Sequence, residues 1–101
     1  MSVEKIDKVL KRAFENLGME KRLKEGRVLG AWDKLVGEQI ARHAQPLGIK
    51  RKKLFVQVDN SNWVYQLTLH HKIDILDKLN QEAEEPLIRD IHFKLGKLGR
   101  E

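Results

Sequence analysis

The densest group of chemically active side chains in this sequence is a run of four consecutive cations, Lys50-Arg51-Lys52-Lys53. Adjacent positive charges repel one another unless an anion lies against them, and phosphate is the anion that such clusters commonly bind. A second cluster follows the start of a helical region and consists of Lys21, Arg22, Lys24 and Arg27. If both clusters share a face, they neutralise several phosphates and give salt-sensitive, sequence-independent binding. Both are therefore candidate nucleic-acid-binding residues, and the alternative is a solvated surface.

Side chains suited to catalysis or metal binding are few and poorly spaced. Cysteine is absent, which excludes thiolate nucleophiles, thiolate metal ligands and disulfides. His70 and His71 are adjacent, about 100° apart on a helix, and cannot chelate one ion from the same face. Ser2 and Ser61 stand at expected helix starts, where capping explains them, and the glycine-rich phosphate loops of nucleotide-binding proteins are missing. We therefore expect a non-enzymatic protein without a metal or cofactor.

Charge is divided unevenly along the 101 residues. Residues 1–53 carry 14 Lys/Arg against 7 Asp/Glu, whereas residues 54–101 carry 6 against 8. A basic half joined to a neutral-to-acidic half is typical of a protein that presents one face to a polyanion. No apolar run approaches the roughly 20 residues of a membrane span, and the amino terminus lacks the apolar core of a signal peptide. We expect a single cytoplasmic domain over residues 1–101.

Helical periodicity predicts two helical regions ahead of any strand. Apolar residues recur at three- and four-residue steps over residues 3–17, and Gly18 is expected to end that helix in the left-handed conformation. The second region runs from about residue 19 to residue 44. A helix-interior glycine costs on the order of 1 kcal/mol relative to alanine, so we expect a break or bend at Gly26 and a continuous helix from Arg27.

The second half of the chain predicts a sheet. Pro46 ends the helix, and the alternation over residues 47–58 predicts a β-hairpin whose tip is the basic tetrad, with its turn type left open because the tip lacks Gly and Asn. Helix-capping side chains precede a third helix that ends near Gln81, and residues 87–95 predict a third strand. The apolar stripe expected on that helix is Val64, Leu67, Ile73, Leu76 and Leu79. The order α-α-β-β-α-β indicates an α+β fold, a three-stranded sheet with helices on one face and the other face uncovered.

The aromatic residues divide into core and contact candidates. Phe14 and Trp32 lie on helix stripes and are expected in the core. Phe55 alternates out of phase with the buried residues of its strand, which places it on the uncovered sheet face. Trp63 and Tyr65 begin the third helix, where partial exposure is expected. An exposed aromatic beside basic residues stacks bases or anchors a protein, so Trp63, Tyr65 and Phe55 are candidate partner contacts.

Three stretches of this sequence resemble the DciA family. They are Trp32-x-x-Leu35-Val36-Gly37-x-x-Ile40-Ala41-x-His43-x-x-Pro46, then Leu54-x-Val56-x-Val58-x-x-Ser61-x-Trp63-x-x-x-Leu67, then Leu79-Asn80 with Ile91-x-Phe93-x-x-Gly96. The resemblance covers roughly residues 29–96. Its specific part is the W-x-x-x-V-G helix paired with the later S-x-W helix start, because apolar alternation alone fits many folds.

The resemblance implies a fold and a role. Family members are similar to a type II KH domain without its G-x-x-G loop, which agrees with the element order expected above. The implied role is binding of single-stranded or forked DNA and assistance in loading the bacterial replicative helicase DnaB. Several relatives carry a flexible extension implicated in helicase engagement, and only residues 97–101 follow the motifs here. The nucleic-acid module is therefore the better-supported part of this expectation.

The sequence also fits two other interpretations. The first is a protein-interaction adaptor that uses the uncovered sheet face and Trp63, with the basic tip aiding solubility alone. The second is a KH-like RNA-binding protein. Salt-dependent binding to DNA, binding to a protein without nucleic acid, and preference for RNA distinguish the three.

Overall fold

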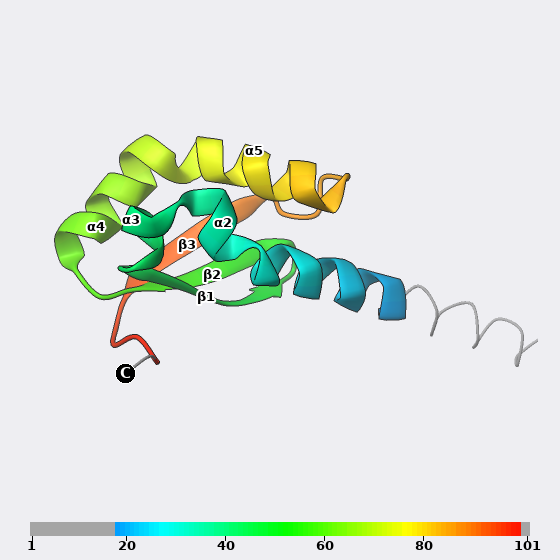
Figure 1. The fold of residues 1–101 in the computed structure, drawn as a ribbon, viewed down its shortest axis with the longest axis horizontal. Helices are drawn as coiled ribbons and strands as arrows, with labels where there is room; N and C mark the ends of the chain where they lie inside the picture. Colours follow the sequence, from blue (N-terminus) through cyan, green and yellow to red (C-terminus); the bar gives the residue numbers. More distant parts are fainter. Residues whose placement is uncertain (1–17, 100–101) are drawn as a thin grey trace, which may run out of the picture.

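A computed structural model describes residues 18–99, which form a layer of helices on a three-stranded sheet (Figure 1). Residues 18–30 are helical. The following elements are α2 (Trp32–Val36), α3 (Glu38–Ala41), β1 (Ala44–Lys50), β2 (Lys53–Val58), α4 (Ser61–Gln66), the π-helical turn η1 (Leu67–His71), α5 (Lys72–Ala83) and β3 (Asp90–Leu95). No helix in this part of the chain is long and apolar enough to cross a membrane. The predicted α+β class and element order are confirmed for the described residues.

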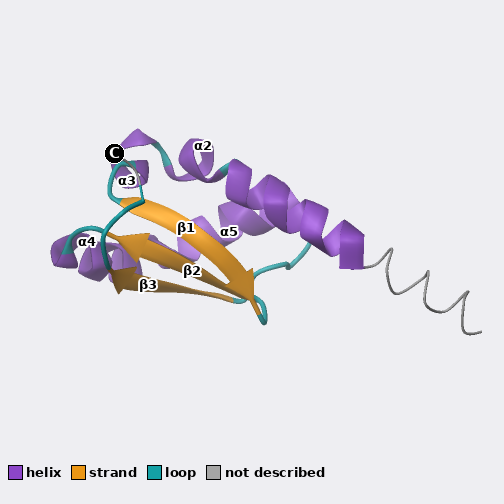
Figure 2. Cartoon of the chain, turned by 90° about the horizontal axis from the view of Figure 1, so that it is seen from below, coloured by secondary structure: helices purple, strands orange, loops and turns teal. Residues whose placement is uncertain are grey.

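The sheet has β2 at its centre, antiparallel to β1 and parallel to β3. Parallel neighbours require a crossover connection, and α4, η1 and α5 supply it. Leu54, Val56 and Val58 point to the helices and are fully buried, as are most of the apolar side chains that meet them. In Figure 1 the helices lie above the sheet, and Figure 2 shows the strands from below. One face of the sheet is thus covered, as predicted.

Trp32 fills the centre of the interface between helices and sheet. It is 1% exposed, and its indole Nε1 donates a hydrogen bond of 3.1 Å to the carbonyl oxygen of Ala44, at the start of β1. The polar atom of a buried indole needs such a partner, so this one side chain both fills volume and fixes the start of the sheet. The predicted core position of Trp32 is confirmed, and Phe14 lies outside the described residues.

The helical breaks differ from those predicted. Residues 18–30 run through Gly26 without interruption, and Gly18 is itself helical rather than left-handed. The chain instead has a turn at Ala31, before α2, and a break at Gly37, between α2 and α3, where φ is 89°, so the continuous helix predicted from Arg27 is wrong. That backbone conformation is readily available only to glycine, whereas a glycine on an exposed helix surface costs little enough to be tolerated. The rest of the predicted first helix, residues 3–17, lies outside the described part.

The third helix buries a different stripe from the one predicted, because a π-helical turn interrupts it. Ile73, predicted in the core, is 78% exposed, and Ile75 is buried between Leu67 and Leu79 instead. The extra residue of the π-helical turn brings Ile75 into phase with Leu67, and Ile73, about 200° from Ile75 on the same helix, points to the opposite side. The prediction for Ile73 is therefore wrong, and those for Leu67 and Leu79 are confirmed.

Both outer strands have boundaries that differ from the prediction. β1 begins at Ala44, ahead of Pro46, which an edge strand tolerates because one side of its backbone needs no ladder partner. The third strand begins at Asp90 rather than at residue 87. The reason is Asn80 on α5, whose Nδ2 donates to the Ile88 carbonyl at 2.9 Å and whose Oδ1 accepts from the Ile88 amide at 2.8 Å. Asn80 thus replaces a sheet partner for that residue.

Replacement of Asn80 by alanine should destabilise the fold substantially. Ile88 is 2% exposed, so the change leaves one backbone donor and one acceptor without partners in a region poor in water. Unsatisfied buried groups cost about 1–3 kcal/mol each, and we expect the free energy of unfolding to fall by about 2–4 kcal/mol. Urea unfolding followed by circular dichroism measures it. Asn80→Asp keeps the acceptor but sets a carboxylate oxygen against the Ile88 carbonyl, so it should also lose stability, and equal stability of all three proteins would contradict this role.

Candidate nucleic-acid interface

The basic tetrad forms the turn of the β1–β2 hairpin, as predicted. Lys50 and Lys53 pair across the two strands, which leaves Arg51 and Lys52 as the two turn residues. Their φ angles are 52° and 63°. Positive φ at both central residues is the signature of a type I′ turn, a turn that strongly prefers Asn-Gly. Two long cationic side chains therefore occupy positions where the backbone favours other residues, and both are exposed.

Two double variants of the turn separate the effect of backbone strain on stability from the effect of charge. Arg51→Asn combined with Lys52→Gly should raise the free energy of unfolding by about 1–2 kcal/mol, because the left-handed conformation then carries less steric cost. Arg51→Gln with Lys52→Gln removes the same charges without the favoured turn residues and should not raise it. Thermal unfolding compares the two variants. Equal melting temperatures would contradict the strain assigned to this turn.

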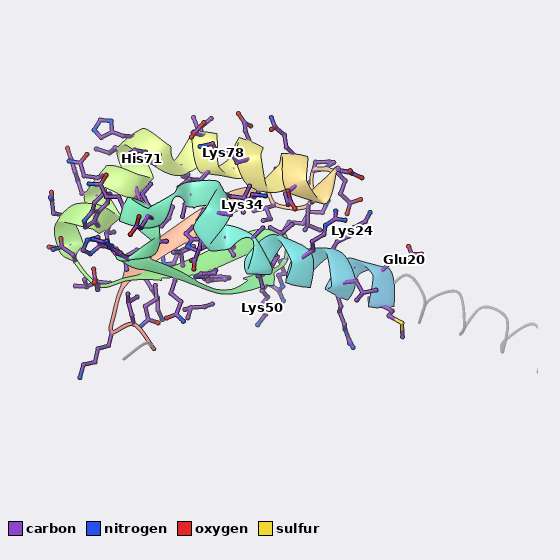
Figure 3. All side chains as sticks on the ribbon, in the orientation of Figure 1. Glu20, Lys24, Lys34, Lys50, His71 and Lys78 are labelled. Carbon is purple, nitrogen blue, oxygen red and sulfur yellow. The ribbon has the colours of Figure 1, made fainter. Side chains whose placement is uncertain are left out.

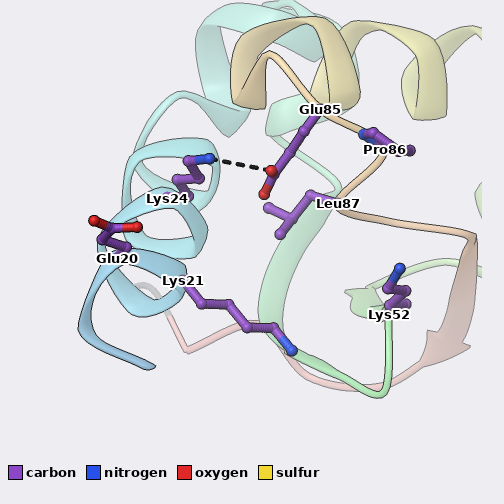
Figure 4. A pocket seen from close by; sticks show the side chains of 7 residues that line it. All are labelled: Glu20, Lys21, Lys24, Lys52, Glu85, Pro86 and Leu87. Atoms are coloured by element: carbon purple, nitrogen blue, oxygen red, sulfur yellow. Dashed lines mark hydrogen bonds and ion pairs between the residues drawn. The ribbon is translucent and has the colours of Figure 1, made fainter. Parts of the chain in front are cut away.

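A groove brings the hairpin turn and the first described helix together. It holds about 360 Å³ and is lined by Glu20, Lys21, Lys24, Lys52, Glu85, Pro86 and Leu87. Figure 4 shows Lys21 extending from the helix toward the hairpin turn that carries Lys52, with the connector before β3 forming the opposite wall. We call it the basic groove. Lys21 and Lys24 of the helix cluster and Lys52 of the tetrad line it, although the two clusters are separated by more than twenty residues of sequence.

Two cations of the helix cluster already have protein partners. Lys24 Nζ lies 3.1 Å from Glu85 Oε2, and both side chains are 40% exposed. A surface ion pair of this kind contributes about 0–1 kcal/mol, so Lys24 can exchange its carboxylate for a phosphate at little cost. Arg27 Nη2 donates to the Glu82 carbonyl at 2.8 Å, near the end of α5. Arginine at a helix C-terminus satisfies carbonyls that the helix leaves unpaired, so Arg27 has a structural role.

The remaining predicted cations lie at different positions on the surface, and all of them are available to bind an anion. Within the described residues, no carboxylate lies within ion-pair distance of Lys21, Arg22, Lys50, Arg51, Lys52 or Lys53. Lys50 also lines a shallow hollow on the uncovered sheet face, away from the basic groove. Arg22 is exposed but lines neither hollow. The predicted set therefore divides between the basic groove and the surfaces beside it.

Trp63 lies at the start of α4, half-buried against the core. Its ring stacks on that of His43, with centroids 5.3 Å apart and planes 18° apart. His43 Nδ1 is 3.1 Å from Asp59 Oδ1, and the Asn60 side chain accepts from the amides of residues 62 and 63. This cluster was not predicted, because His43 lies 16 residues ahead of Asp59 along the chain. It fixes the start of α4, and Asn60 rather than Ser61 is the cap.

Tyr65 belongs to an exposed apolar stripe. Tyr65, Leu69 and Ile73 are 60%, 58% and 78% exposed and follow one another at four-residue intervals along α4, η1 and α5. Side chains with this spacing share a helix face. Part of the stripe was not predicted, since Ile73 was expected in the core. Large exposed apolar side chains on one face are a feature of protein-binding surfaces.

Phe55 stands on the sheet face away from the helices, as predicted. Phe55 of β2 pairs with His92 of β3, and the two rings meet edge to face, with centroids 5.9 Å apart.

Asp90, the sole carboxylate of the three strands, lies 2.6 Å from Lys72 Nζ. That hydrogen bond, together with the nearby Lys53 charge, holds the pKa of Asp90 below its usual value despite the opposing effect of burial. No three potential metal ligands cluster in the described part of the chain.

Comparison with known proteins shows to which family the chain belongs. A family model described as "Dna[CI] antecedent, DciA" matches residues 5–93. The chain belongs to the DciA family. The resemblance found from the sequence motifs over residues 29–96 is thus confirmed, and the DciA match extends further toward the amino terminus.

Several DciA-related proteins of actinobacteria carry the name UPF0232. One from Rhodococcus jostii is 32% identical over 76 residues, which are 75% of this chain and 40% of the relative. Others come from Corynebacterium glutamicum, 30% identical over 90 residues, and Mycobacterium tuberculosis, 29% identical over 86 residues, covering 89% and 85% of this chain. The chain spans about half or less of the length of these curated relatives.

The DciA motifs serve mainly to build the fold. Trp32 fills the core, Gly37 makes the break between α2 and α3, and Asn80 holds the connector before β3. The cations of the basic groove lie outside the motif residues. The motifs identify the DciA family but do not include the charged surface.

Proposed function

We propose that this domain binds DNA, single-stranded or forked, through the basic groove and the hairpin turn beside it. Lys21 and Lys52 face one groove from two elements, and Arg51 projects from the same turn. Successive phosphates along a strand are neutralised by cations spaced along such a surface, which releases counterions and favours association. The observation that carries the proposal is this convergence of two basic clusters on a single groove.

The position of the cations in the turn supports the same proposal. Arg51 and Lys52 hold left-handed backbone angles at a cost of about 1–2 kcal/mol each. Strained residues persist where they serve a purpose that other residues would not serve. Here the purpose is charge, since Asn-Gly would relieve the strain and remove both cations.

We further propose that the domain acts without catalysis, as an accessory protein of replication initiation that assists loading of the replicative helicase DnaB in the bacterial cytoplasm. Family membership supports this role. The basic groove supports the DNA-binding part of it, because a helicase loader must act where single-stranded DNA is exposed.

The test is a titration of fluorescein-labelled single-stranded DNA at several salt concentrations. We expect the logarithm of the association constant to fall linearly with the logarithm of salt concentration, with a slope near −0.7 for each phosphate neutralised. Three to five contacts give a slope of roughly −2 to −3.5. Absence of binding at low salt would refute the proposal, and tighter binding to RNA of the same sequence would assign the domain to RNA instead.

The exposed stripe of Tyr65, Leu69 and Ile73 favours a second candidate, binding of a partner protein. This surface lies on the helical side of the molecule, remote from the uncovered sheet face (Figure 1). Protein binding and DNA binding therefore need not exclude each other. Pull-down of purified DnaB by the wild-type chain and by Leu69→Ser with Ile73→Ser tests this candidate. Equal recovery would remove the stripe from the helicase interface.

A further inference from the structure

We infer that the uncovered face of the sheet binds unpaired bases by stacking on Phe55 and His92. The inference rests on the proposed function and deepens it. The basic groove contacts phosphates, which duplex and single strand share, whereas a stacking surface accepts only bases that are free of a complementary strand. The occupant proposed for this face is therefore single-stranded nucleic acid.

The register of the sheet puts the two rings at its centre. Phe55 of the middle strand pairs with His92 of β3 and with Gly48 of β1. Glycine adds no side chain beside the phenyl ring, so a hollow of about 350 Å³ opens there, lined by Leu47, Gly48, Ile49, Lys50, Phe55 and Lys94. Phe55 is half-buried and His92 exposed. A flat base can thus lie on the phenyl ring from the β1 side.

The charge of this face is complementary to a phosphate chain. Lys53 and Lys94 alternate in phase with Phe55 and His92 and so share their face, and Lys50 lines the same hollow as Phe55. The sole carboxylate in the strands, Asp90, is neutralised by Lys72. Aromatic rings flanked by three lysines, with no free carboxylate in the strands, match the combination that tracks a single strand.

Two further contacts limit where the strand can run. The segment after β3 crosses one end of this face, where the side chain of Gln57 donates to the Lys97 carbonyl and the Gly99 amide donates to Gln45 Oε1 at 2.9 Å. The opposite end adjoins the hairpin turn with Arg51 and Lys52. A strand that stacks on Phe55 therefore continues past Lys50 toward the turn, and from there to the basic groove.

The experiment compares Phe55 variants on an oligothymidine of about ten nucleotides and on a duplex of the same length. Phe55→Ala should weaken single-strand binding roughly tenfold at every salt concentration and leave duplex binding unchanged, because stacking involves no counterion release. Phe55→Leu, which keeps the apolar volume, should lose as much. Phe55→Trp should retain affinity, and its added tryptophan fluorescence should be quenched by the oligonucleotide beyond the change seen in the wild type.

The outcomes separate this inference from the proposed function. If Phe55→Ala binds like the wild type while loss of Lys21 and Lys52 weakens binding, bases do not stack here and the phosphate groove stands. If the wild type binds no nucleic acid, both proposals fail. If sedimentation shows a dimer that Phe55→Ala dissociates, a second copy covers this face and the inference is wrong.

Discussion

Charge reversal of both groove lysines, Lys21→Glu with Lys52→Glu, is expected to weaken DNA binding by roughly 10- to 100-fold near 50 mM salt. The two side chains line one groove from separate elements, so each change removes an attraction and adds a repulsion on the path of the same phosphates. Each lost phosphate contact should also reduce the magnitude of the salt slope by about 0.7. Fluorescence anisotropy at several salt concentrations measures both effects.

The matched control is Lys34→Glu with Lys78→Glu, which changes the net charge equally at two exposed positions away from the groove (Figure 3). If only the overall charge of +5 attracts DNA, both double variants should lose the same affinity. If the groove is the site, the control should lose much less and keep its salt slope. Equal losses would contradict a localised interface.

Replacement of Trp32 by alanine is expected to lower the free energy of unfolding by about 3–5 kcal/mol, which leaves a domain of this size partly unfolded at 37 °C. The side chain is almost fully buried, and its removal also leaves the Ala44 carbonyl without its indole donor. Trp32→Phe keeps most of the volume and should lose only the hydrogen bond and part of the packing. Thermal unfolding followed by circular dichroism compares the three proteins.

A loss below 1 kcal/mol for Trp32→Ala would show that the family motif at this position serves a function other than packing. The DNA affinity of any folded fraction then becomes informative. Trp32 does not line the basic groove, so an intact fold should bind DNA as tightly as the wild type.

A strand could be predicted from the sequence where one of its faces is buried along its whole length. The alternation of Leu54, Val56 and Val58 sets the phase of β2, and that phase in turn places Phe55 on the opposite face. The hairpin turn followed from the same pattern, since four polar residues between two apolar strands leave little other room for it. Local periodicity is sufficient in these cases because one strand face meets one core.

Other features depended on contacts between distant residues. The π-helical turn at Leu67–His71 brought Ile75 into phase with Leu67 and left Ile73 exposed, and no periodicity count anticipates an inserted residue. Asn80 took the place of a sheet partner for Ile88, which shortened the third strand. The break at Gly37 rather than Gly26 reflects where the chain must turn, a property of the assembled fold rather than of glycine alone.

The candidate site was predictable in its chemistry but not in its shape. Both basic clusters were evident as runs of Lys and Arg, yet their meeting across one groove depends on how helix 18–30 lies beside the hairpin. The opposite wall, with Glu85 and Leu87, gave no signal in the sequence. Nor did the role of Arg27, which the end of α5 uses as a helix cap.

The most direct test of a single phosphate-binding surface is the mapping of backbone amide shifts as short single-stranded DNA is added to the ¹⁵N-labelled chain. We predict that the largest shifts fall together on residues 21–24, on the hairpin turn at 50–53 and on the connector at 85–87, with Phe55 and His92 following if bases stack on the sheet. Shifts confined to the Tyr65–Ile73 face, or absent at a DNA concentration that saturates binding, would contradict the basic groove as the site.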